Sequence, residues 1–225
     1  MLSARDDTDE AARGALASLC NAYWFALYAY VRRRGHDPDS ARDLVQGYFV
    51  ELIDRGFLRQ VRPDAGRFRA FLLHTMKHFL ANEALRAATL KRGGGTSTIK
   101  LDAEDLERRF GDSLADHRTP ESEYERQWAL TLVERVMDRL ERDAARKDRA
   151  REFARIRGFL TDGATRGDHE RVAAELSMSP GTLRVTIHRL RRRFGQFLRE
   201  EIAGTVADAS DIDDEIRHLF AALGS

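Results

Sequence analysis

The chain has 225 residues, of which 42% are hydrophobic and 33% are charged, and its formal net charge is +1. This length allows one or two domains with substantial cores, and the near-neutral balance excludes a protein that attracts anions over its whole surface. The acidic amino-terminal residues and the lack of a long apolar run predict a cytoplasmic protein without a signal peptide or membrane span. The single cysteine, Cys20, cannot form an internal disulfide.

Apolar residues recur at helical spacing along most of the chain, which contains only four prolines, so we expect an all-α fold. The spacing predicts a first helix over residues 16–31, ended by Gly35. An N-cap residue followed by proline, Asp37 and Pro38, begins the next helix, whose buried stripe is expected to include Ile53. Its outer side carries Asp43, Gln46 and Glu51.

A long helix is predicted from Arg67 to about Lys91, with phenylalanines and leucines, Leu85 among them, packed inward. Basic residues mixed with aromatic ones suit single-stranded nucleic acid, where bases stack and phosphates pair with cations. A solvated basic face over a phenylalanine core is an equally consistent interpretation. His74 and His78 have the spacing of metal ligands, but no third ligand accompanies them, so we predict neither a metal nor a cofactor.

Residues 93–119 begin with three glycines and mix Gly, Ser, Thr and acids without a clear period. We interpret this segment as a flexible linker between two domains. The glycines do not form a phosphate-binding loop, because no lysine followed by serine or threonine stands at the required spacing.

The strongest pattern of the second half lies between Glu170 and Phe194 and predicts a helix–turn–helix. Val172 and Leu176 mark a short first helix, and residues 177–179 form the turn. Ser179 then offers a hydroxyl to the unpaired amides of the next helix, which begins with a proline. An ordinary helical hairpin with a solvated basic face is the alternative.

The second of these helices has opposed apolar and basic faces. Its apolar stripe comprises Leu183, Ile187, Leu190 and Phe194. No acidic residue occurs between Leu176 and Arg199, so the opposite face is strongly positive. A helix of this width fits the DNA major groove, where arginine is the commonest reader of guanine.

Beyond residue 200 the charge reverses, and residues 201–225 form an acidic extension that ends in an amphipathic helix. We favour its interpretation as a helix that caps the second domain. The alternative is an acidic tail that screens the arginine face when DNA is absent.

Three motifs stand in a particular order on the two sides of the linker. They read ARDLVQGYFVELI (Ala41–Ile53), GRFRAFLLHTMKHFLANEALR (Gly66–Arg86) and SMSPGTLRVTIHRLRRRF (Ser177–Phe194). In this order the chain resembles bacterial RNA polymerase sigma factors of the small, two-domain extracytoplasmic-function (ECF) type. The resemblance implies a region 2-like domain over 14–92, the linker over 93–119, a region 4-like domain over 120–200 and an extension over 201–225.

The resemblance also implies roles for individual residues. The polymerase clamp would be bound by Asp43, Gln46 and Glu51. The downstream, minus-ten element would be bound by Arg67, Phe68, Arg69, Lys77, His78, Asn82 and Arg86. The upstream, minus-thirty-five element would be bound by Ser179, Thr182, Arg184, Val185, His188, Arg189, Arg192 and Arg193.

The implied partners are core RNA polymerase and promoter DNA, and the sequence does not reveal whether an anti-sigma factor or a kinase acts on the chain. A stand-alone helix–turn–helix regulator, which would usually dimerise on two half-sites, is the alternative function. We do not expect an enzyme, because the sequence offers no metal-spaced carboxylates, no Ser/His/Asp set and no thiol nucleophile in a basic setting.

Overall fold

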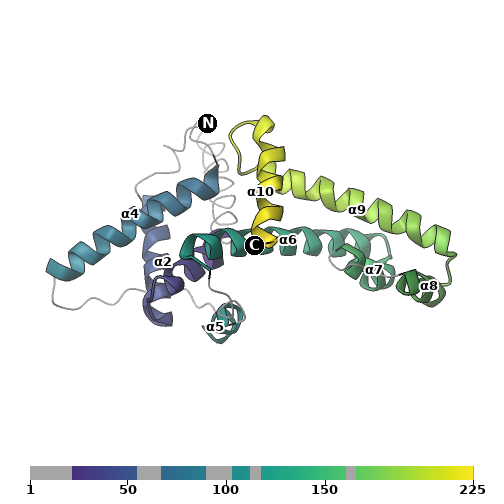
Figure 1. Cartoon of the computed structure of the whole chain (residues 1–225), viewed down its shortest axis with the longest axis horizontal. Coiled ribbons are helices and arrows are strands. Elements are labelled where there is room, and N and C mark those ends of the chain that lie inside the picture. Colours follow the sequence, from purple (N-terminus) through teal and green to yellow (C-terminus); the bar gives the residue numbers. More distant parts are fainter. Residues whose placement is uncertain (1–21, 55–66, 90–102, 112–117, 161–165, 225) are drawn as a thin grey trace, which may run out of the picture. The chain divides into compact units, whose positions relative to one another are not determined.

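The computed structural model describes residues 22–54, 67–89, 103–111, 118–160 and 166–224, and is drawn in Figure 1. Over these ranges the regular secondary structure is helical and contains no strand, so the predicted all-α class is confirmed. None of the helices described is both long enough and apolar enough to span a bilayer. The chain divides into two compact units, one within Met1–Thr131 and Thr205–Ser225 and the other within Leu132–Gly204.

The first unit is built around a helix over residues 22–33, which is buried on almost every side. A helix that is apolar all round belongs at the centre of a core. The unit further contains α2 (Pro38–Asp54), α4 (Phe68–Thr89), α5 (Ala103–Gly111), the start of α6 (Pro120–Arg146), the short 3-10 turn η2 (Ala209–Asp211) and α10 (Ile212–Gly224).

Side chains cap the starts of α2, as predicted at Asp37, and of α6. The backbone N–H of Ser40 donates to the Asp37 carboxylate at 3.0 Å, and the backbone N–H of Ser122 donates to Thr119 Oγ1 at 3.1 Å. Both contacts satisfy amides that lack a partner within their own helix. Gly35 ends the first helix with a φ of +92°, a conformation that glycine adopts without a steric penalty. Cys20 lies outside the described residues.

Two residues predicted to pack inward are exposed instead. Ile53 is 50% exposed and Leu85 is 68% exposed. The last buried residue of α2 is Leu52, and that of α4 is Leu80. Both helices therefore extend past the core, and their apolar period continues over a stretch that none of the elements described in the structure buries.

The segment predicted to be an irregular linker contains α5, and this helix packs against the first unit. Leu106 and Phe110 are buried, and the Phe110 ring meets Tyr28 edge-on at a centroid distance of 6.5 Å. Arg32 lies 4.7 Å from the centre of the Phe110 ring. The prediction of an aperiodic linker is wrong for these residues, where Leu106 and Phe110 stand four apart on one face of a helix whose other positions are mostly charged.

Glu107 anchors α5 through a bidentate ion pair. Arg32 donates from Nε and Nη2 to the two Glu107 oxygens, each at 2.9 Å, and the Tyr28 hydroxyl donates to the same carboxylate. These hydrogen bonds, those from Arg32 above all, lower the pKa of Glu107. Because the folded-state pKa is depressed, the pair stabilises the protein above the unfolded carboxyl pKa, and this stability is lost as the pH falls through the folded pKa.

Replacing Glu107 with glutamine is expected to lower the free energy of unfolding of the first unit by about 1 kcal/mol at neutral pH. The difference from the wild type should shrink as the pH falls toward the lowered pKa, because the wild-type carboxyl then becomes neutral as well. Both tryptophans, Trp24 and Trp128, belong to the first unit, so denaturation followed by tryptophan emission reports on it.

Glu83→Gln is the matched control within the same unit. Glu83 forms an exposed pair with Arg86, one helical turn away, at 2.6 Å. Such surface pairs contribute about 0.3–0.5 kcal/mol. An equal or larger effect at Glu83, or an effect at Glu107 that persists in acid, would contradict the prediction.

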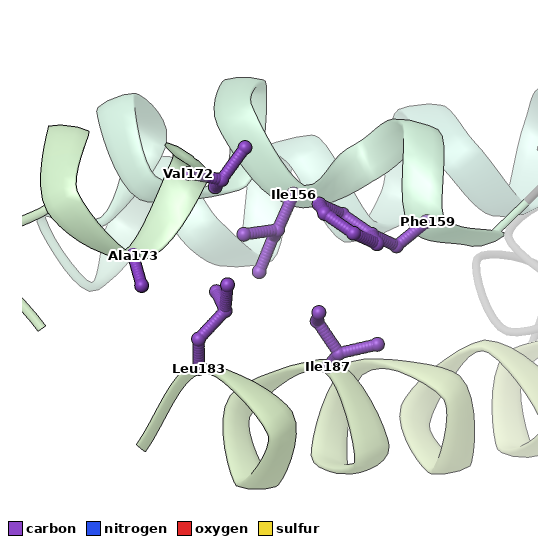
Figure 2. Close-up of a cluster of buried hydrophobic side chains, with 6 residues drawn as sticks. All are labelled: Ile156, Phe159, Val172, Ala173, Leu183 and Ile187. Carbon is purple, nitrogen blue, oxygen red and sulfur yellow. The ribbon is translucent and has the colours of Figure 1, made fainter. Parts of the chain in front are cut away.

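The second unit contains the remainder of α6 together with four further elements, namely α7 (Ala150–Ile156), the 3-10 turn η1 (Arg157–Leu160), α8 (Arg166–Glu175) and α9 (Pro180–Ala203). Its buried residues near the start of α9 form one cluster, drawn in Figure 2. The members are Ile156, Phe159, Val172, Ala173, Leu183 and Ile187.

The acidic carboxy-terminal helix, which we expected to cap a second domain beginning at residue 120, packs against the start of α6, where His218 lies beside Glu125 and Trp128. Residues 205–225 belong to the first unit, where α10 buries Glu215, Leu219 and Ala222. The alternative interpretation placed the acidic residues against the arginine face of α9. Asp214 and Glu215 instead pair with Arg67, beside the start of α4. The sequence identified the acidic charge correctly but could not identify its partner, which is far away along the chain.

Candidate nucleic-acid interface

The start of α9 is held by the residues predicted to begin it. Ser179 is in an extended conformation, and its hydroxyl accepts a hydrogen bond from the Thr182 amide at 3.1 Å. Pro180 follows as the first helical residue, where its missing N–H costs nothing. Ser177 turns the chain with a φ of +52°. This conformation is uncommon for a residue that has a Cβ atom, and it separates α8 from α9 sharply.

Apolar packing holds α9 against the elements that precede it. Figure 2 shows Leu183 and Ile187 pointing from α9 toward Ile156, Phe159 and Val172, which come from α7, η1 and α8 respectively. Leu183 has no exposed surface. Because two successive turns of α9 are fixed in this way, the position of its opposite face relative to α8 is also fixed.

That opposite face is exposed and basic. Most of the residues predicted to bind the upstream element are exposed along it, namely Ser179, Thr182, Arg184, Val185, His188, Arg189 and Arg192. They span about three and a half helical turns, a length that the major groove accommodates. The structure thus brings this group of predicted residues together on one face.

Arg193 differs from the other members of the predicted set because it is half-buried. Its guanidinium lies 4.3 Å from the centre of the Phe197 ring, and its Nε is 3.7 Å from the Asp143 carboxylate. Arg139 stacks on the same ring at 4.0 Å. A guanidinium that already has an aromatic and an acidic partner reaches out to DNA less easily than Arg192 does.

A second group of cations lies beside Arg193 and was not among the predicted residues. A hollow of about 300 Å³ in the second unit is lined by Arg139, Arg142, Asp143, Arg146, Arg193 and Phe197. The three α6 arginines stand at spacings of three and four, which places them on one helical face. That spacing is visible in the sequence, but the many charges between Glu141 and Arg151 conceal it.

The middle of α4 presents several predicted downstream-element residues to solvent. His78, Asn82 and Arg86 are exposed. Lys77 pairs with Glu121 at 2.7 Å, and this hydrogen bond raises the pKa of the lysine. His74 and His78 approach within 3.2 Å between their Nε2 atoms. No group of three or more metal-binding side chains occurs in the part of the chain that the structure describes.

The start of α4 is arranged differently, because α10 lies against it. Arg67 pairs with Glu215 at 3.0 Å, and Arg69 is only 5% exposed. Phe68 is half-buried and meets the Tyr23 ring edge-on at 5.3 Å. The residues predicted to bind the downstream element therefore fall into a covered group at 67–69 and a more accessible group farther along the helix.

The residues predicted to bind polymerase lie on the outer part of α2. Asp43 is exposed, whereas Gln46 and Glu51 are half-buried. The exposed apolar residues Val50 and Ile53 add an apolar component to this surface. Glu51 also lines a hollow of about 230 Å³ between α2 and α4, together with Tyr48, Leu52, His74, Thr75, His78, Phe79 and Asn82. Residues predicted for two different partners are thus close neighbours.

Comparison with known proteins adds no relative: no family model, curated protein or solved structure matches the chain.

Proposed function

We propose that this chain is a sigma factor, a subunit that binds core RNA polymerase and directs it to promoters at transcription initiation. The observation that carries the proposal is α9, whose exposed arginines share one face while Leu183 and Ile187 fix the opposite face to α7, η1 and α8. In this proposal α8 and α9 form the helix–turn–helix that reads the upstream element. The proposed assignment to ECF sigma factors rests on the resemblance of the three sequence motifs to that family.

Recognition of duplex DNA in this proposal depends on two kinds of contact. Exposed arginines such as Arg184 and Arg189 hydrogen-bond base edges in the major groove and select the sequence. Arg192, with Arg142 and Arg146 beside the α6 hollow, contacts phosphates, which adds affinity that falls with salt and does not depend on sequence. Ser179 and Thr182, at the start of α9, would bring hydroxyls and the helix amino terminus to a phosphate.

Promoter opening is assigned to the first unit. Bases that leave the duplex lose stacking, which costs a few kcal/mol, and aromatic and cationic side chains can offset this cost. His78, Asn82 and Arg86 lie along the exposed part of α4, where a melted strand could follow them. The outer face of α2 would meanwhile bind the polymerase clamp, so that RNA synthesis is carried out by the polymerase.

Run-off transcription with core polymerase tests the proposal. Adding the purified chain should produce transcripts from a subset of host promoter fragments, and the chain should co-migrate with core polymerase in size-exclusion chromatography. No transcript from any fragment, combined with no co-migration, would overturn the proposal. A stable dimer that binds a palindromic duplex without polymerase would instead identify a stand-alone regulator.

A further inference from the structure

The carboxy-terminal helix α10 covers the start of α4, where three of the predicted strand contacts, Arg67, Phe68 and Arg69, lie. The backbone N–H of Phe68 donates to the carbonyl oxygen of Thr205 at 3.1 Å, so the chain that leads into α10 contacts the first residue of α4. Glu215 of α10 is 1% exposed. The carboxy-terminal segment therefore lies directly against the predicted strand contacts.

The Arg69 guanidinium is enclosed between α10 and the start of α6. Its Nε donates to Glu215 Oε1 at 2.5 Å, and its Nη1 donates to Glu125 Oε1 at 2.5 Å. The guanidinium lies 5.1 Å from the centre of the Trp128 ring. A phosphate or a base cannot reach Arg69 while these partners surround it.

Arg67 is neutralised by the same helix. Its Nε is 3.0 Å from Glu215 Oε2, and its Nη2 is 3.8 Å from Asp214 Oδ2. Glu215 thus bridges both arginines. Its carboxylate oxygens occupy the kind of position that phosphate oxygens take beside paired guanidinium groups.

We propose that α10 is an intramolecular competitor of the single strand: it occupies the arginines at the start of α4 and must leave before they can bind DNA. This inference rests on the proposed function for the identity of the ligand. Only the undocked molecules can bind the strand at this site. The apparent association constant is therefore the intrinsic constant multiplied by the undocked fraction, so docking of α10 weakens strand binding. Strand binding must in turn favour the undocked state.

The contacts of α10 are consistent with reversible docking. Its buried residues are Glu215, Leu219 and Ala222, whereas the apolar Ile212, Ile216 and Leu223 are only half-buried. Phe220 is 55% exposed. The ion pairs of Glu215 add specificity rather than large net stability, since burying the charges offsets most of their attraction. The residues that precede α10, 207–210, are exposed.

Glu215→Gln tests the competition, with Asp211→Asn as the charge-matched control outside the ion-pair cluster. Binding of a fluorescent single-stranded oligonucleotide of mixed sequence is measured by anisotropy on the full chain. Glu215→Gln should bind the strand at least about tenfold more tightly than the wild type, whereas Asp211→Asn should differ little. Binding of an upstream-element duplex should be unchanged in both variants. Unchanged strand affinity in a folded Glu215→Gln variant, or no strand binding by either protein, would overturn the proposal.

Hydrogen exchange on the wild-type chain provides a second test that does not depend on how the variant folds. Adding the single strand should increase amide exchange across residues 212–224, because bound molecules have an undocked α10. It should also change the emission of Trp128, whose ring lies 6.1 Å from that of His218. Unchanged or slower exchange in α10 at saturating strand would mean that α10 is a permanent part of the first unit.

The two proposals fail separately. Co-migration with core polymerase and run-off transcription test the sigma-factor function without reference to α10. Loss of that function together with increased α10 exchange would leave a strand-binding protein controlled by its own terminus. Normal transcription together with an unresponsive α10 would retain the sigma factor and remove the competitor.

Discussion

Replacing Leu183 with alanine is expected to lower the free energy of unfolding of the second unit by about 2–5 kcal/mol. Leu183 is fully buried where α9 packs against α8 and η1, and its removal leaves a cavity at the centre of the cluster. A loss of this size is a large fraction of the stability of a typical domain. Binding to an upstream-element duplex should be lost with it, because the basic face of α9 would no longer be held in position.

The chain offers both a matched control and two spectroscopic probes. Val185 lies two residues along the same helix and is 50% exposed, so Val185→Ala should change stability by about 0.5 kcal/mol or less. Far-UV circular dichroism reports on both units, whereas Trp24 and Trp128 report on the first one alone. Leu183→Ala should therefore shift part of the dichroism transition and leave the tryptophan transition in place. A wild-type dichroism transition in this variant would contradict the assigned packing.

Arg189→Ala is expected to weaken recognition of the upstream element by about 1–3 kcal/mol, concentrated at one base position. Arg189 is exposed on α9, one residue from His188 and opposite the buried Ile187. An arginine that forms two hydrogen bonds to guanine loses both in the variant, and the variant should tolerate other bases at that position. The measurement is initiation by the complex of core polymerase and this chain on a library randomised across the upstream element.

Arg192→Ala is the contrasting variant. Arg192 stands about one turn farther along the exposed face and is assigned to a phosphate. Its loss should weaken binding equally on all sequences and reduce the slope of log affinity against log salt by about 1. If Arg189→Ala also weakened binding equally on all sequences, Arg189 would be a phosphate contact and another residue would read the base.

Local signals in the sequence determined the helical character of the chain and several helix starts. Asp37 with Pro38 and Ser179 with Pro180 each begin a helix as expected, because capping depends on residues within one turn of each other. The apolar stripe of α9 was also predictable, since helical periodicity encodes which side is buried.

Only the tertiary structure decided what the charged and terminal segments contact. Arg69 stands among basic and aromatic residues, as an exposed strand-binding arginine would. In the structure it is buried beside Glu215, which is distant along the chain. Glu107 draws α5 onto the first unit through Arg32, although the surrounding sequence indicates an irregular linker. Ion pairs between distant residues produce no periodic pattern in the sequence. The same residue type can be a solvated surface charge or one partner of a buried pair, and its neighbours along the chain do not distinguish the two. The sequence by itself therefore determined the helices and the basic face of α9, while the pairing of α10 with the start of α4 emerged only from the fold.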